Sequence, residues 1–397
     1  MHGARHAPRA HTRLGRSGGT GGRGAAVRVT TRTPRPAGPG RARVAQNGGS
    51  VGRAAPAIER AGPVESAERG DGAPTSAPPD RRPVAAGRFR HAAAVVTSDA
   101  ELLAVALPFL QAGVRAGDLV AMTCPPDVVE LVCAELGEAG PGVEADTALS
   151  LLGARAPDVL SSARRFVQRA EEAPSGRLRV LSVVDFGDRP AGWREGLRYE
   201  SASNRLLQDD AVTSVCVYDR RRLVPEVVAS AGSTHPELVQ GHALVPSPAF
   251  RDPLDYIPAL PWPRDPVEDT PPALVVGAAA SLAGLRHAIG AVLAERVPDR
   301  DQREDLHLAT SEVAANAFRH GRPPVSARLW TDGSQMVCAI TDAGRQFGDP
   351  LAGFRPAHGD DLSRGGMGLW LARKLWDSVD LLPGADGLTV RLSTRLR

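Results

Sequence analysis

Short apolar runs alternate with amphipathic segments along the chain from Phe89 onward. Apolar runs between turn residues predict buried strands, and apolar residues spaced three and four apart predict helices. Strands are expected at Arg90–Val96, Leu119–Thr123, Leu178–Asp185 and Val212–Tyr218. Helices are expected at Asp99–Ala112, Pro126–Leu136, Val159–Glu172, Gly196–Leu207 and Val224–Ala231, and a short apolar element at Ala148–Leu152. Strands that alternate with helices predict an α/β domain with a parallel sheet.

Helix-end signals accompany the first two helices. Ser98 precedes the first helix and is expected to cap it, because a serine oxygen can accept a hydrogen bond from the free N–H groups there. Gly113 is expected to end the first helix and Gly137 the second.

The pattern changes after residue 272. The predicted helices are Ala280–Arg296, Arg303–Arg319 and Leu369–Trp376, and the predicted strands are Ala273–Val276, Val325–Thr331, Met336–Thr341, Val379–Leu382 and Leu388–Thr394. The Asp332-Gly333 pair predicts a hairpin between the second and third of these strands. Helices over an antiparallel sheet predict a two-layer α/β sandwich. The stretch 343–364 is poorly periodic and is expected to be a mobile lid.

Two segments separate or precede these domains. Residues 251–272 carry many prolines among acidic residues, which predicts a semi-rigid linker. Residues 1–86 are dense in Gly, Pro, Arg and Ala and are expected to be a disordered extension. The predicted organisation is therefore an extension (1–86), a first domain (87–250), a linker (251–272) and a second domain (273–397).

Charge is uneven along the chain. The net charge is +3, but residues 1–90 hold 17 arginines against 5 acidic residues. This arm has no aromatic residue before Phe89 to stack on bases, so direct DNA binding is not expected. No signal-peptide pattern and no apolar run long enough to span a bilayer are evident, so we expect a cytoplasmic protein without membrane attachment.

The four cysteines lie far apart in the sequence. Cys124, Cys133, Cys216 and Cys338 show no pair at metal-ligand or redox spacing. Each lies in an apolar segment, which predicts a small buried hydrophobic residue.

Glu312 and Asn316 are the first candidate site residues. They are four apart on a predicted helix, so they lie one turn apart on a face that borders the apolar stripe. A carboxylate and an amide oxygen placed in this way can hold magnesium and orient a hydroxyl. A solvated polar face is the alternative interpretation of a lone Glu-x-x-x-Asn.

Two downstream stretches favour the site over the solvated face. Asp342 ends a predicted strand, where a carboxylate can accept a hydrogen bond from an amino group such as that of adenine, and Gly344 opens the following loop. Gly365, Gly366 and Gly368 precede a predicted helix, whose N-terminal amides can bind phosphate. Together the three stretches predict one nucleotide site.

Their order resembles the GHKL ATPase superfamily and, within it, the bacterial anti-sigma-factor serine/threonine kinases. The resemblance implies that Asn316 coordinates Mg²⁺, that Glu312 assists the attacking hydroxyl, and that Asp342 binds the adenine of ATP. Gly344, Gly366 and Gly368 would shape the surrounding loops. The family loop Asp-x-Gly-x-Gly has Gln346 in place of its second glycine here.

The same resemblance implies a kinase that phosphorylates an antagonist protein and sequesters a sigma factor, and it allows a homodimer. Because of Gln346, a catalytically weak nucleotide-binding switch that acts by protein binding alone stays open. A sensor histidine kinase shares the ATP fold but needs a helical hairpin with a phospho-accepting histidine, which the proline-rich segment before Ala273 does not supply.

The first domain resembles the MEDS sensory domain, a RecA-like parallel α/β module. The matching stretches are His91, Phe109-Leu110-x-x-Gly113-x-x-x-Gly117-Asp118, Tyr199-Glu200-x-x-x-Asn204-Arg205-Leu206, Val215–Asp219 and Thr234-His235-Pro236. Cys124-Pro125-Pro126-Asp127 occupies the place of a P-loop without its glycines or lysine, so no nucleotide hydrolysis is expected in this half. His91 and His235 are candidates to line a site for a small-molecule signal, with ordinary capping or surface histidines as the alternative.

Overall fold

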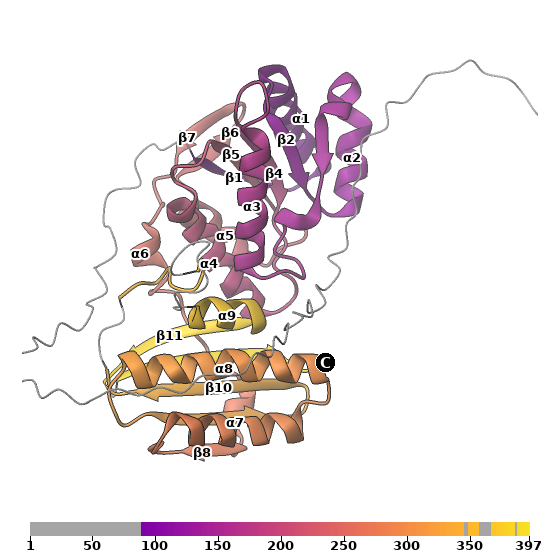
Figure 1. Cartoon of the computed structure of the whole chain (residues 1–397). Coiled ribbons are helices and arrows are strands. Elements are labelled where there is room, and N and C mark those ends of the chain that lie inside the picture. Colours follow the sequence, from indigo (N-terminus) through magenta and orange to yellow (C-terminus); the bar gives the residue numbers. More distant parts are fainter. Residues whose placement is uncertain (1–88, 345–347, 357–366, 386) are drawn as a thin grey trace, which may run out of the picture.

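In the computed structural model, residues 89–344, 348–356, 367–385 and 387–397 are described. They form two sheets with helices packed on them, and Figure 1 shows the two units stacked on each other. The extension 1–86, Gln346 and Gly366 lie outside the described residues. Among the helices that are described, none is both long enough and apolar enough to cross a bilayer.

The first sheet is parallel except at one edge. Its strand order is β3-β2-β4-β5-β1-β6-β7, and only the β6–β7 pair is antiparallel. The strands are β1 (Arg90–Val96), β2 (Leu119–Thr123), β3 (Val143–Ala145), β4 (Leu178–Val183), β5 (Val212–Asp219), β6 (Glu237–Gln240) and β7 (Ala243–Pro246). The predicted parallel α/β sheet is confirmed. The sequence analysis missed β3, β6 and β7, because these strands of three or four residues are too short for a periodic signal.

Helices cover both faces of this sheet. They are α1 (Asp99–Ala116), α2 (Pro126–Leu136), α3 (Ala156–Ala170), α4 (Pro190–Leu206) and α5 (Pro225–Thr234), with short 3-10 turns at Gly137–Gly142 and Thr147–Leu149. Buried residues of α1 and α2 pack against one face, and those of α3 and α5 pack against the other. Helix α4 begins six residues earlier than predicted, at Pro190, because proline suits the first turn of a helix.

The predicted end of α1 at Gly113 is wrong. The helix continues to Ala116 and is capped by Gly117 in the left-handed conformation (φ 76°), while Ser98 caps its start as predicted. Gly113 lies against the sheet, where a Cβ atom would come within 2.4 Å of Arg179 and 2.8 Å of Val120. This glycine therefore permits close helix–sheet packing instead of ending the helix.

The second sheet is antiparallel, with strand order β11-β12-β10-β9-β8. Its strands are β8 (Leu274–Val276), β9 (Ser326–Thr331), β10 (Gln335–Asp342), β11 (Ser378–Gly384) and β12 (Gly387–Arg395). Helices α7 (Leu282–Arg296), α8 (Arg300–His320) and α9 (Gly368–Leu375) bury their apolar residues on this sheet together with the fully buried Trp376. The predicted two-layer α/β sandwich and its hairpin are confirmed.

The proline-rich segment 251–272 is packed against both units. Tyr256 is the last residue of the short helix α6 (Pro253–Tyr256), and Ile257 comes directly after it. Both side chains are buried among residues of α3 and α4. Val267, in the 3-10 turn η3 (Pro266–Asp269), is buried against Trp330 and Val337 of the second sheet. The proline content alone could not distinguish this packed segment from the spacer that we expected.

Part of the stretch 343–364, which was predicted to be a mobile lid, packs against the first unit. Phe354 is 1% exposed and lies in one core cluster with residues of α3, α4 and α6, and Leu351 packs beside it. Arg373 of α9 places its guanidinium over the Phe354 ring, 4.4 Å from the ring centroid. The described part of this stretch, 348–356, is therefore anchored by the first unit.

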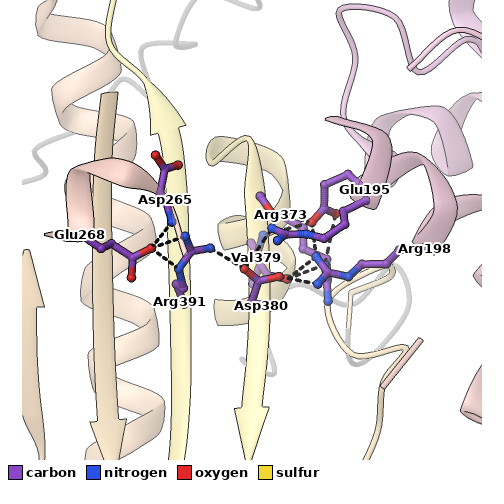
Figure 2. Close-up of polar contacts among 10 residues, drawn as sticks. Glu195, Arg198, Asp265, Glu268, Arg373, Val379, Asp380 and Arg391 are labelled. Carbon is purple, nitrogen blue, oxygen red and sulfur yellow. Dashed lines mark hydrogen bonds and ion pairs between the residues drawn. The ribbon is translucent and has the colours of Figure 1, made fainter. Parts of the chain in front are cut away.

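A buried carboxylate joins the two units. Asp380 on β11 is fully buried and pairs with Arg194 (3.2 Å) and Arg198 of α4 and with Arg391 (2.7 Å) of β12. Figure 2 shows Arg391 between Asp380 and Glu268, its second partner. Burial alone would raise the pKa of Asp380, but the charges of Arg198 and Arg194 outweigh burial and hold that pKa below its ordinary value.

Further polar contacts surround this carboxylate. Glu195 of α4 accepts hydrogen bonds from the Ser378 hydroxyl (2.9 Å) and the Val379 amide (3.3 Å). At the end of α9, Lys374 pairs with Asp158 of α3 at 2.6 Å. Asp377, directly after α9, pairs with Arg155 and Arg189 of the first unit. Helices α3 and α4 therefore contact α9 and β11 through charged groups along most of the interface.

Asp380→Asn should lower the free energy of unfolding by about 3–5 kcal/mol, because three buried guanidinium groups would lose the counter-charge that they share and only Arg198 and Arg391 would keep another ion pair with a described residue. The depressed pKa means that the carboxylate stabilises the fold above its unfolded pKa of about 3.9 and loses this effect as the pH falls through the folded value. The difference between variant and wild type should therefore shrink in acid. Urea unfolding at several pH values, monitored by tryptophan fluorescence, measures this difference in the free energy of unfolding.

Asp269→Asn is the matched control. Asp269 is 74% exposed and pairs with Arg264 at 3.5 Å, so its loss should cost less than about 1 kcal/mol. Equal stability of Asp380→Asn and Asp269→Asn at neutral pH would contradict the role given to the buried carboxylate.

Candidate functional site

Helix α8 presents Glu312 and Asn316 at the edge of its buried face. Leu306, Ala309 and Val313 pack into the core of the second unit, which fixes the rotation of the helix. Glu312 and Asn316 are both half-buried, one turn apart on the same helix. The structure thus places this predicted pair at the boundary between core and solvent.

The start of α9 lies directly against Asn316. A Cβ atom built on Gly368 would come within 2.5 Å of Asn316 Nδ2 and 3.2 Å of the Glu312 carbonyl oxygen. Any larger residue at this position would have to displace the Asn316 side chain or shift one of the two helices. Asn316 makes no hydrogen bond to another residue that the structure describes, so its amide is available to a ligand.

The first turn of α9 has free backbone donors. Met367 precedes the helix and provides no side-chain cap, and the first intrahelical bond runs from the Leu371 amide to the Met367 carbonyl (2.8 Å). The preceding amides of this turn have no partner within the helix. Gly366 was predicted to shape this loop, but it lies outside the described residues.

Asp342 lies at the end of β10 beside the C-terminus of α8. Its Oδ1 accepts hydrogen bonds from the amides of Gly344 (2.7 Å) and Arg322 (3.2 Å). Oδ2 accepts none from the described part of the chain, although the residue is only 6% exposed. The two loop amides thus hold Asp342 Oδ1 in place, and Oδ2 can accept a hydrogen bond from a ligand.

Glu312 has a partner that the sequence analysis did not anticipate. Arg286 of α7 places Nη2 3.8 Å from Glu312 Oε1 and donates from the same nitrogen to the Ser311 carbonyl oxygen at 3.3 Å. Both side chains of the pair are about one third exposed. Arg286 therefore orients the carboxylate, and a basic residue on the neighbouring helix is a contact that local spacing could not reveal.

These groups fit a nucleotide with magnesium. Asn316 offers an amide oxygen that has no partner among the described residues, the α9 start offers amides for phosphate, and Asp342 offers an acceptor for an amino group. Asn316 and Gly321, the C-cap of α8 beside Asp342, are five residues apart, or about 7.5 Å along the helix. The candidate site is therefore elongated, with the start of α9 at one end and Asp342 at the other.

The first unit contains a second polar cluster, around the two predicted sensory histidines. The rings of His91 on β1 and His235 after α5 are both buried, with centroids 4.0 Å apart. Buried Glu200 of α4 lies 3.2 Å from His91 Nε2 and 3.5 Å from His235 Nε2. Cys216 of β5 lies 3.3 Å from His91 Nε2. Neither histidine is a surface residue.

The expectation that Cys216 is only a buried hydrophobic residue is therefore incomplete. Its sulfur joins the two histidines and Glu200, although its apolar strand gave no sign of this. Burial, and then the Glu200 carboxylate, raise the pKa of the Cys216 thiol well above its ordinary value. Burial, and then the nearby His91, lower the pKa of His235 well below its ordinary value.

Comparison with known protein families identifies both units. The family profile described as "MEDS: MEthanogen/methylotroph, DcmR Sensory domain" matches residues 90–236. The profile described as "Histidine kinase-like ATPase domain" matches residues 276–394. The first match covers β1–β5 and α1–α5 of the first unit and stops before β6 and β7, and the second covers nearly all of the second sheet with its helices.

Two curated relatives match the second unit in part. They are the serine-protein kinases RsbW of Bacillus velezensis (strain FZB42) and Bacillus subtilis (strain 168), each 32% identical over 107 residues. The match covers 24% of this chain and 66% of each relative, just under two thirds of their length. This chain joins a MEDS sensory domain to a histidine kinase-like, GHKL-type ATPase domain that is similar to the serine-protein kinase RsbW.

Proposed function

We propose that the chain is an ATP- and Mg²⁺-dependent serine/threonine protein kinase regulated by its MEDS domain. The observation that supports it most is the contact of the α9 start with Asn316, on the helix whose C-terminus lies beside Asp342. The similarity to proteins named serine-protein kinase supports the reaction class. By the resemblance of the motifs, its partners are an antagonist protein, which it phosphorylates, and a sigma factor, which it sequesters.

The residues have separate roles in this reaction. The Asn316 amide oxygen would hold Mg²⁺, which neutralises phosphate charge when bound. The amides of the α9 start orient the phosphates, and Asp342 Oδ2 selects the base. Glu312, held by Arg286, accepts the proton of the attacking serine or threonine hydroxyl. Phosphoryl transfer depends mainly on such positioning and charge stabilisation.

The contact between the domains supports regulation of this site. Helix α9 contributes its first turn to the nucleotide site and its last turn to the interface, where Arg373 and Lys374 face the MEDS domain. Arg373 lies 3.6 Å from Glu195 and donates a hydrogen bond to the Ala352 carbonyl oxygen at 2.9 Å. A shift of α3 or α4 would therefore move α9 relative to Asn316.

A nucleotide-binding switch without turnover is the second candidate. Gln346 favours it, because this residue stands where the loop of the resembled family has its second glycine. The two candidates differ in one respect: the kinase needs Glu312 for transfer, whereas the switch needs only the nucleotide.

Asn316→Ala should weaken Mg²⁺-dependent ATP binding by about 10–100-fold, as expected for the loss of a charge-assisted contact worth about 1.5–3 kcal/mol. Calorimetric titration of the full chain with ATP in the presence and absence of Mg²⁺ measures the change. Asp301→Ala, exposed in the first turn of the same helix, is the control. Unchanged affinity in Asn316→Ala would rule out the assigned metal ligand.

Glu312→Gln should retain ATP binding and slow phosphoryl transfer by about 10²–10⁴-fold, the usual contribution of a general base. Transfer from γ-labelled ATP to antagonist proteins of the same genome is the assay. Glu304→Gln is the control, because Glu304 lies 62% exposed on the same helix and pairs with Arg300. If wild type and Glu312→Gln bind ATP and neither transfers phosphate, the switch is the correct function.

Gly368→Ala should lower ATP affinity at least about tenfold, because the added methyl group meets Asn316 Nδ2 at 2.5 Å and displaces the first turn of α9. Gly277→Ala, where nothing lies within 4 Å of the added atom, should bind ATP as the wild type does. Thermal unfolding of both variants separates a local displacement from a loss of fold. Wild-type affinity in a folded Gly368→Ala would contradict the close contact between α9 and Asn316.

A further inference from the structure

Four side chains of the MEDS domain direct donor atoms at one buried point. They come from different elements: His91 from β1, Glu200 from α4, Cys216 from β5 and His235 from the end of α5. One ligand atom from each lies within 4.8 Å of the other three, and all four residues are buried. A single metal ion could therefore touch all four.

The hydrogen bonds around His91 fix its tautomer. Asn204 donates from Nδ2 to the carbonyl oxygens of Glu200, Ser201 and Thr234, at 2.8–3.1 Å. The Asn204 Oδ1 atom is therefore an acceptor, and His91 Nδ1, 3.0 Å away, must carry the hydrogen. In the neutral ring this leaves the lone pair on Nε2, which faces Cys216 and Glu200.

His235 is held in the same way. Its Nδ1 donates to the Ala231 carbonyl oxygen at 3.0 Å, so the lone pair of the neutral ring lies on Nε2. This nitrogen is buried and has no hydrogen-bond partner among the described residues. Its nearest ionisable neighbour is Glu200 Oε2 at 3.5 Å, which in the charged form can only accept.

At the centre of the cluster, hydrogen-bond acceptors outnumber donors, and none of the four side chains brings a fixed positive charge. Two imidazole lone pairs and one carboxylate converge, and the Cys216 thiol is the single donor among the four atoms that face the centre of the cluster when the histidines are neutral and Glu200 is ionised. One thiol hydrogen can satisfy one acceptor. A divalent cation satisfies all of them together, and backbone-anchored N–H groups on metal-binding histidines are the usual support for such a site.

We propose that His91, Glu200, Cys216 and His235 bind one zinc-type divalent transition metal. Zinc bonds of about 2.0–2.3 Å at tetrahedral angles place neighbouring ligand atoms about 3.3–3.6 Å apart. Four of the six distances between the ligand atoms are 3.2, 3.3, 3.5 and 3.7 Å, and the other two are within 4.8 Å. The mixture of thiolate, imidazole and carboxylate suits zinc and not magnesium or calcium.

Binding replaces the thiol hydrogen of Cys216 by the metal and releases that proton to solvent. A cavity of about 60 Å³ lined by His91, Glu200 and Cys216 adjoins the cluster. It is the route by which an ion, or a small ligand of that ion, can reach the site. Because the cluster lies wholly in the MEDS domain, this inference does not depend on the kinase proposal.

The test uses the full chain, stripped with a chelator and then titrated with Zn²⁺ or Co²⁺ alone. Wild type should take up one Zn²⁺ per chain, measured by elemental analysis after gel filtration, and its unfolding temperature should rise. The Co²⁺ form should show thiolate-to-cobalt charge-transfer absorption. Cys216→Ser should lose this absorption, and Asn204→Ala should lower Zn²⁺ affinity by about 10–100-fold through its support of His91.

Cys338→Ser is the matched control, because Cys338 is also fully buried but lies in the apolar core of the ATPase domain. It should bind Zn²⁺ and Co²⁺ as the wild type does. A wild-type chain that binds no Zn²⁺ and keeps its unfolding temperature would overturn the proposal. So would full Zn²⁺ binding by both Cys216→Ser and His235→Gln, which would place the ion elsewhere.

Discussion

The arrangement of the two domains depends on the charge of one buried carboxylate. Asp380 lies on β11 of the ATPase sheet, yet two of its three arginine partners, Arg194 and Arg198, come from α4 of the MEDS domain. Three buried guanidinium groups without this acid would repel one another in a poorly solvated place. Arginines of the MEDS domain therefore neutralise a buried acid of the ATPase domain, and these ion pairs fix the position of each domain relative to the other.

This constraint gives α9 two functions. Its first turn lies against Asn316, while its last turn and Asp377 are held by α3 and by Arg189 at the start of α4. Helix α4 also carries Glu200, a member of the buried cluster in the MEDS domain. A change at that cluster can thus reach the proposed nucleotide site through α4 and α9, which are in contact through Glu195 and Arg373. Phe354, buried in the MEDS domain, provides a second connection.

Sequence patterns predicted both α/β units and most strand and helix cores, because local periodicity encodes these features. They also placed Glu312 and Asn316 on one helix and Asp342 at a strand end, as the structure has them, and the nucleotide site itself stays a prediction. Contacts between distant segments were not predictable in this way. The Arg286–Glu312 pair, the burial of Phe354 and the role of Cys216 each depend on segments brought together by the fold. Gly113 shows the same limit: it was expected to end a helix, but its close neighbours are Arg179 and Val120 on the adjacent sheet.

Hydrogen–deuterium exchange of the full chain with and without Mg²⁺-ATP tests the central claim most directly, namely that the nucleotide site and the MEDS domain are coupled through α9. The account predicts slower exchange at the first turn of α9 and at Gly344, together with changed exchange in α4 around Glu195 and Arg198. Protection in the ATPase domain that leaves α3 and α4 unchanged would contradict the coupling. Slower exchange elsewhere in the ATPase domain without any change at α9 would contradict the assignment of the α9 start to the nucleotide site.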